Sequence, residues 1–193
     1  MIEIKKASEL GESARKQISE IFVEGFGDLH TFFSKDRRKL AIAFEHMFVL
    51  DVFFVALVDG EIAGITACTD RGIFPIDHNK KVLKKHLGFL KGTFAYIVFQ
   101  REFQKPPFEL GENKAWIEFV ATSAKYRGKG VASAIMNHIH ALPRYNEYIL
   151  VVADNNTNAL NMYDKLGYKE FKRVKHKYSK YSGIDHMIYM KYK

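Results

Sequence analysis

Apolar residues recur along the chain with two periods, and the changes of period divide it into expected strands and helices. β-Branched and aromatic runs predict strands at residues 2–6, 52–58, 61–69, 116–122, 148–153, 168–174 and 184–191. Apolar positions three and four residues apart predict helices at residues 18–26, 35–50, 78–90, 93–104, 131–142 and 157–166. In a chain of 193 residues this order predicts one α/β domain that spans residues 1–193.

The segment at residues 116–142 combines a strand, a glycine-rich turn and a helix. A helix start leaves several backbone N–H groups unpaired and carries the positive end of the helix dipole. Gly128 and Gly130 let an anion approach the backbone of this turn, and Arg127 and Lys129 add positive charge beside it. The turn therefore predicts a binding site for a pyrophosphate.

Two other phosphate-binding loops fit this turn poorly. The Walker pattern G-x-x-x-x-G-K-[ST] does not occur in the chain. The dinucleotide fingerprint G-x-G-x-x-G/A fails at Ser133, which stands where the third small residue is needed. The pattern that does fit is R-x-x-G-x-A, which runs from Arg127 through Gly130 to Ala132.

This pattern resembles the acetyl-CoA-binding motif of the GNAT family of N-acetyltransferases. A second block, from Asn156 to Tyr168, is similar to that family's N-x-x-A-x-x-x-Y-x-x-x-G-[FY] signature and lies at the expected distance downstream. The strand and helix patterns between the two motifs also follow the family's order. The resemblance covers residues 114–175 closely and the rest of the chain by the order of its elements.

The resemblance implies a GNAT-like fold, with a mixed, mostly antiparallel sheet and flanking helices, splayed between its fourth and fifth strands. It implies acetyl-CoA as co-substrate, and transfer of the acetyl group to a primary amine by direct attack in a ternary complex. The pantetheine arm would pair with the fourth strand, where the N–H of Val120 would polarise the thioester carbonyl. The implied coenzyme A contacts are Phe119, Val120, Ala121, Thr122, Arg127, Gly128, Lys129, Gly130, Val131, Ala132, Asn156 and Tyr163.

Two residues of the second motif have both a functional and a structural interpretation. Tyr163 stands at the position of the family's general-acid tyrosine, whose phenol donates a proton to the departing sulfur. On an amphipathic helix it would otherwise be a core tyrosine. Asn156 would contact the cofactor arm, cap the helix that follows, or do both.

Glu118 is the carboxylate nearest to the expected site and is our candidate for the general base. Strict alternation along the strand places it opposite Ile117 and Phe119, on the same face as Val120. The family offers no fixed motif for this role.

Residues 71–113 exceed the short turn that a minimal member of the family has between its third and fourth strands. Their lysines and aromatic residues predict a helical insertion. Its aromatic stripe either packs as core or forms a wall of the acceptor site, and both interpretations stay open. Together with Phe26, the insertion indicates an acceptor that has an apolar or aromatic part.

The cysteine, the N-terminal segment and the histidines indicate the expected location of the protein and its need for a metal. Cys68 is the single cysteine and lies in an apolar run, so we interpret it as a small buried residue. The sequence shows neither a signal peptide nor a long apolar segment, so we expect a cytoplasmic protein without a membrane partner. His138 and His140 point in different directions on a helix, so we expect no metal.

The formal charge of +8 comes partly from lysines in the last third of the chain. Such a run usually forms a solvated face, and no nucleic-acid-reading motif accompanies it, so we expect no nucleic-acid partner. A homodimer stays open. The main rival to an enzyme is a non-catalytic acyl-CoA-binding or regulatory module, which would keep the turn at residues 127–132 without an acid and a base.

Overall fold

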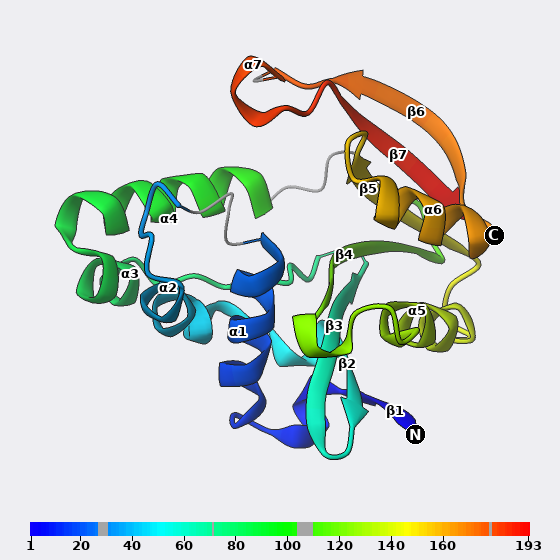
Figure 1. Ribbon diagram of the computed structural model, residues 1–193, viewed down its shortest axis with the longest axis horizontal. Helices are drawn as coiled ribbons and strands as arrows, with labels where there is room; N and C mark the ends of the chain where they lie inside the picture. Colours follow the sequence, from blue (N-terminus) through cyan, green and yellow to red (C-terminus); the bar gives the residue numbers. More distant parts are fainter. Residues whose placement is uncertain (27–30, 71, 104–109, 178) are drawn as a thin grey trace.

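The computed structural model describes residues 1–26, 31–70, 72–103, 110–177 and 179–193, and it confirms the mixed α/β class (Figure 1). Seven strands form one sheet in the order β1-β2-β3-β4-β5-β7-β6. The strands are β1 (Ile2–Lys6), β2 (Phe53–Val58), β3 (Glu61–Thr69), β4 (Lys114–Thr122), β5 (Glu147–Ala153), β6 (Lys169–Lys175) and β7 (His186–Tyr192). All neighbours pair antiparallel except β4 and β5, which pair in parallel. The predicted closing pair, β6 and β7, is present, with β7 next to β5.

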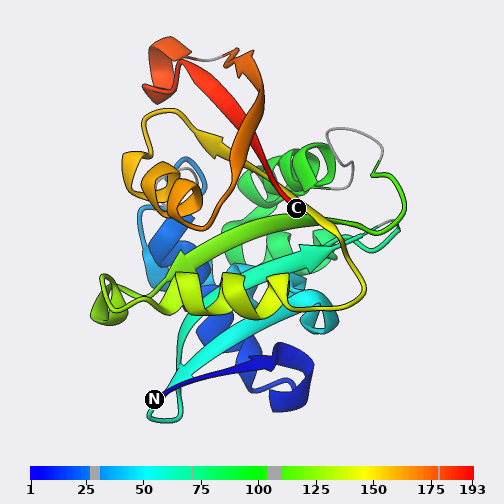
Figure 2. The same ribbon diagram turned by 90° about the vertical axis from the view of Figure 1, so that its right-hand side faces the viewer.

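The helices cover both faces of the sheet. They are α1 (Ala14–Phe26), α2 (Arg37–Phe44), α3 (Lys80–Leu87), α4 (Phe89–Phe103), α5 (Val131–His140), α6 (Thr157–Lys165) and the short α7 (Ser179–Ser182). Buried side chains of α1 to α4 form one core cluster with one face of the sheet, and those of α5 and α6 form a second cluster with the other face. Figure 2 shows α5 in front of the sheet and the first helices behind it. In the described parts of the chain, none of the helices combines the length and apolar character that a membrane span requires.

The helix expected at residues 35–50 is shorter than predicted. α2 ends at Phe44, and a 3₁₀ turn (Glu45–Met47) follows it. The reason is a long-range contact, because the carbonyl of Met47 accepts from the N–H of Asp77 at 2.7 Å and the N–H of Val49 donates to Pro75 at 3.0 Å. These bonds to a distant segment replace the helical ones.

The predicted insertion contains the two expected helices, α3 and α4, although residues 71 and 104–109 lie outside the described residues. Gly88, at φ +85°, separates the helices, and a Cβ at Gly92 would lie 2.5 Å from the Cα of Lys84. Glycine is therefore needed where the two helices cross closely. The inner faces of both helices, including Leu83 and Phe99, belong to the main core cluster.

β4 contains a bulge that alters which residues share a face. Phe119 has φ +55°, and between Glu118 and Ala121 the strand has one residue more than its partner β3 has between Ala67 and Ile65. Glu118 pairs with Ala67, which lies in the main core cluster formed with α1 to α4, and Phe119 packs on the same cluster. Val120 packs on the opposite cluster. Strict alternation was therefore wrong here, because Glu118 and Phe119 share one face and Val120 lies on the other.

Candidate active site

β4 and β5 separate partway along their length. Their parallel pairing covers only the first part of each strand, from Lys114 with Glu147 to Ile117 with Leu150. Beyond that point β5 continues to pair with β7, and β4 continues to pair with β3. The β5 side of residues 118–122 is thus an open strand edge among the described residues, and such an edge can pair with an extended ligand.

The loop that follows β4 is fixed by three hydrogen bonds to two elements, β3 and α1. The N–H of Ser123 donates to the carbonyl of Ala63 at 2.9 Å, and the N–H of Ala124 donates to Glu24 on α1 at 2.9 Å. The hydroxyl of Tyr126 donates to Glu61 on β3 at 2.8 Å. The course of the chain from the open edge to α5 is therefore well anchored.

The helix α5 begins directly after the glycine-rich turn, as the sequence predicted. Gly128 and Gly130 have φ +73° and +77°, in the left-handed region that favours glycine, and the N–H of Ala134 donates to the carbonyl of Gly130. The backbone N–H groups of residues 131–133, in the first turn, precede this bond. Arg127 and Lys129 are exposed beside them, and Nε of Arg127 lies 3.3 Å from the carbonyl oxygen of Thr122. The arrangement combines unpaired donors, a helix dipole and two cations, which suits a pyrophosphate.

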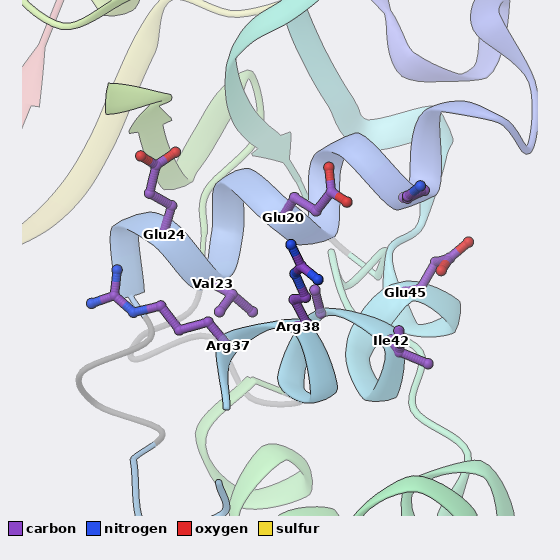
Figure 3. A pocket seen from close by; sticks show the side chains of 9 residues that line it. Glu20, Val23, Glu24, Arg37, Arg38, Ile42 and Glu45 are labelled. Carbon is purple, nitrogen blue, oxygen red and sulfur yellow. The ribbon is translucent and has the colours of Figure 1, made fainter. Parts of the chain in front are cut away.

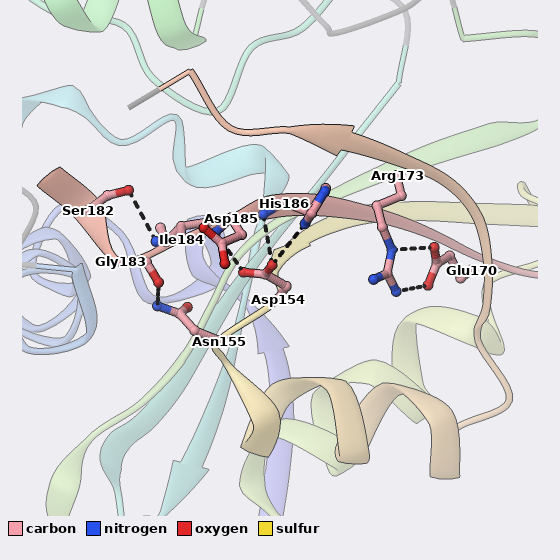
Figure 4. Close-up of polar contacts among 9 residues, drawn as sticks. All are labelled: Asp154, Asn155, Glu170, Arg173, Ser182, Gly183, Ile184, Asp185 and His186. Atoms are coloured by element: carbon pink, nitrogen blue, oxygen red, sulfur yellow. Dashed lines mark hydrogen bonds and ion pairs between the residues drawn. The ribbon is translucent and has the colours of Figure 1, made fainter. Parts of the chain in front are cut away.

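Asn156 begins α6 as an N-cap, since its side-chain oxygen accepts from the N–H of Ala159 at 3.2 Å. The capping interpretation is thereby confirmed. The turn just before it is held by Asp154, which accepts from the N–H groups of Asp185 and His186, at 3.1 and 2.8 Å (Figure 4). The sequence predicted only the cap at Asn156, because the bonds from Asp154 to the start of β7 are long-range.

Tyr163 lies on the inner side of α6, and only 6% of it is exposed. It belongs to the same buried cluster as Ile117 at the end of the paired part of β4 and Val131 at the start of α5, and Val120 packs against that cluster. Burial raises the pKa of the Tyr163 phenol well above its ordinary value. The phenol therefore keeps its proton at physiological pH and can act as a donor.

Glu118 lies on the other face of β4, where the strand begins to separate from β5. Burial raises the pKa of its carboxyl from 4.5 to about 7, and a side-chain hydrogen bond from Trp116 partly offsets that rise. A carboxylate with a pKa near 7 is suited to take a proton at neutral pH. Trp116 was not among the predicted site residues. It lies two residues before Glu118 on β4, and no family motif includes that position.

A groove of about 620 Å³ lies between α1 and α2, apart from these residues (Figure 3). Glu20 and Glu24 of α1 and Arg37 and Arg38 of α2 line it, and Ile42 adds an apolar surface. None of the predicted site residues lines the groove. The groove is linked to the site through Glu24, whose carboxylate also accepts from the N–H of Ala124 in the loop after β4.

The surroundings of His140 and Cys68 indicate structural roles for both residues. Nε2 of His140 lies 2.9 Å from the hydroxyl of Tyr168, its ring stacks on Tyr192, and burial lowers its pKa to about 4. Within the described ranges, no group of three or more His, Cys, Asp or Glu side chains is placed to hold a metal ion. Cys68 is buried, which raises the pKa of its thiol to about 12 and disfavours a nucleophilic thiolate, consistent with its interpretation as a core residue.

With this geometry in place, comparison with known proteins identifies the class. The profile of the acetyltransferase (GNAT) family matches residues 16–168, and the chain belongs to that family. No match was found among curated proteins.

Solved structures of low sequence identity share the fold. An N-acetyltransferase from Staphylococcus aureus Mu50 is 17% identical, with a TM-score of 0.66, and the match covers 98% of this chain and 100% of that one. PH1933 from Pyrococcus horikoshii OT3 is 21% identical, with a TM-score of 0.58, and covers 99% and 97%. The ribosomal-protein-S18-alanine N-acetyltransferase from Escherichia coli is 14% identical, with a TM-score of 0.58, and covers 99% and 92%. The GNAT-like fold predicted from the two motifs is confirmed.

Proposed function

We propose that this protein is an acetyl-CoA-dependent N-acetyltransferase that acts on a primary amine. The observation that carries the proposal is the separation of β4 from β5, with a glycine-lined helix start at one end of the gap and Tyr163 in the adjoining cluster. The open edge at residues 118–122 would pair with the pantetheine arm. The first turn of α5, with Arg127 and Lys129, would hold the pyrophosphate.

The groups proposed to act in catalysis lie on both faces of β4. Glu118, on the α1 face, would accept the proton that the amine loses as its nitrogen bonds to the acetyl carbon. The N–H of Val120 would donate to the carbonyl oxygen, where negative charge develops. Tyr163, in the cluster on the opposite face, would donate its proton to the sulfur as the carbon–sulfur bond breaks. The bulge puts Glu118 on the face of β4 opposite to Val120, which packs on the cluster that contains Tyr163. The base, Glu118, and the acid, Tyr163, would therefore approach the thioester from different sides.

The surroundings of Glu118 indicate the kind of acceptor. Trp116 pairs with Ile149 on β5, and these two buried residues adjoin Val151 and Tyr189. The apolar row continues to Phe171 on β6, whose ring lies 6.2 Å from that of Tyr189 and which is 42% exposed. We infer that the amine is carried on an apolar or aromatic body that lies along this row. The sequence-based expectation of such an acceptor rested instead on Phe26 and the insertion, which pack with the cluster of α1 to α4.

A thiol-release assay tests the proposal. Purified protein is incubated with acetyl-CoA and a panel of primary amines that includes aromatic and aliphatic members and peptides, and free coenzyme A and acetylated product are both measured. The proposal predicts stoichiometric release and acetylation, fastest for an apolar or aromatic amine. Binding of acetyl-CoA without turnover for any amine would favour the non-catalytic module.

A further inference from the structure

The outer face of α4 carries an apolar stripe that the acetyltransferase site does not use. Leu90, Phe94 and Ile97 follow one another at spacings of four and three residues, so they lie on one side of the helix. They are 80%, 47% and 52% exposed. Large exposed apolar side chains that are adjacent on a surface mark an interaction site more often than isolated ones do.

The stripe points outward because the opposite side of α4 is committed to the core. Ala95 and Phe99 are fully buried in the main cluster, and Gly92 meets the backbone of α3. In Figure 1 α3 and α4 form one edge of the molecule. Exposed Phe32, whose ring lies 5.3 Å from that of Phe94, widens the stripe on one side.

The surroundings of the stripe are strongly basic. Between Asp77 and Glu102 the chain has six lysine and arginine residues and no acidic residue. Two of the cations, Lys91 and Arg101, are exposed on α4 itself. Nζ of Lys84 on α3 lies 4.1 Å from the ring centroid of Phe89, which begins α4. A partner for this surface must therefore accept apolar side chains and carry negative charge.

We propose that the outer face of α4 docks on an anionic lipid bilayer, with Leu90, Phe94 and Ile97 entering the interface and the flanking cations contacting the headgroups. Apolar insertion combined with basic residues gives reversible membrane attachment, whereas either signal alone is marginal. The absence of a membrane-spanning helix in the described residues does not bear on this mode, because the helix lies along the surface. The proposal departs from the expectation, drawn from the sequence, that the chain has no membrane partner.

Charge decides between a bilayer and a second copy of the chain. A twofold contact through this face would bring Lys91 and Arg101 close to the same residues of the other copy, and like charges across an interface disfavour association. A bilayer that contains acidic lipids offers the opposite charge over the whole surface. The proposal is independent of acetyl transfer, so vesicle binding and catalysis can succeed or fail separately.

Co-sedimentation with vesicles tests the proposal. We expect the full chain to pellet with vesicles of phosphatidylglycerol and phosphatidylcholine and to stay in solution with phosphatidylcholine alone. Leu90→Gln combined with Ile97→Gln, which preserves charge and helix propensity, should weaken binding by about tenfold or more. Lys91→Gln with Arg101→Gln should weaken it by about tenfold or more as well. The matched control, Lys165→Gln with Lys175→Gln, removes the same charge from exposed sites on α6 and β6 and should bind almost as the wild type does.

Four results would overturn the proposal. Wild-type protein that stays in solution with the anionic vesicles would point to an acidic protein as the partner. Undiminished binding by the Leu90 and Ile97 variant would show that charge alone acts. An equal loss in the Lys165 and Lys175 control would show that net charge is responsible. A concentration-dependent dimer that the Leu90 and Ile97 substitutions disperse would assign the stripe to self-association.

Discussion

The two halves of β4 have nearly the same composition of apolar residues and opposite surroundings. The first half, Lys114 to Ile117, is paired with β5 along its whole length and with β3 at Trp116 and Ile117. At its start, Nζ of Lys114 lies 2.7 Å from the buried carboxylate of Glu147. The second half, residues 118–122, is paired only with β3 and contains the bulge at Phe119. One half of the strand therefore holds the sheet together, and the other half leaves main-chain groups and a perturbed carboxyl available for chemistry.

Stability of the sheet and the proposed chemistry therefore depend on different halves of β4. Burial would raise the pKa of Glu147, but Lys114 and Lys193 lower it below its ordinary value, so this carboxylate is stabilised as an ion. Burial raises the pKa of Glu118, so its charge is costly in the folded protein. Substitutions in the two halves should therefore differ in their effects as strongly as these surroundings imply.

The largest effect is expected at the open half, in Glu118→Gln. Loss of a general base should reduce kcat/KM by about 10² to 10⁴. In the wild type the ionised base is lost as the pH falls, so kcat/KM should decline below about pH 7, and the variant should lack this decline. A pH–rate profile of coenzyme A release measures both effects. An unchanged profile in the variant would remove Glu118 from the mechanism.

The next effect concerns the opposite face, in Tyr163→Phe. Removal of the phenolic proton should lower kcat by about 10², whereas the affinity for coenzyme A should change little, because the ring stays in the same cluster. Steady-state kinetics and a binding titration separate the two quantities. Equal turnover by the variant and the wild type would leave Tyr163 as a core residue only.

At the closed half, Lys114→Met should lower the free energy of unfolding by about 2 kcal/mol, since the buried Glu147 keeps only Lys193 as a partner. The control is Lys169→Met, whose partner Asp164 is 3.3 Å away and where both side chains are largely exposed, so the loss should stay below about 1 kcal/mol. Urea denaturation measures both. Equal losses would contradict the special role of the closed half.

A smaller and opposite effect is expected for the stability of Glu118→Gln. The folded-state pKa lies above the ordinary value of 4.5, so ionisation opposes folding and wild-type stability declines as the pH rises from 4.5 through about 7. The variant should be more stable by about 1 to 2 kcal/mol at pH 8, after allowance for partial exposure, and no more stable at pH 4. Thermal melts at the two pH values measure the difference. A variant that is less stable at pH 8 would contradict the cost of this charge.

Local features of the site were predictable from the sequence, and features that depend on distant partners were not. Gly128 and Gly130 predicted a turn before a helix, and Asn156 predicted a cap, because both signals act within a few residues. The bulge at Phe119 carries no glycine or proline and arises from pairing with β3, so strict alternation assigned Glu118 to the wrong group of neighbours.

The same reason explains the fold-level differences. α2 ends early because residues 75–77 supply hydrogen bonds to residues 47–49, which no local pattern reveals. The aromatic insertion was expected to pack as core or to line the acceptor site. Its inner face does pack in the core, but Leu90 and Ile97 on its outer face are exposed, and the sequence alone could not tell which face meets the core.

Calorimetric titration with coenzyme A is the most direct test of the central claim, that the open half of β4 and the start of α5 bind this co-substrate. We predict one site per chain, and affinity reduced by about tenfold in Arg127→Ala, which removes one of the two cations proposed to hold the pyrophosphate from an otherwise intact loop. Absence of measurable binding by the wild-type protein at millimolar coenzyme A would contradict the account.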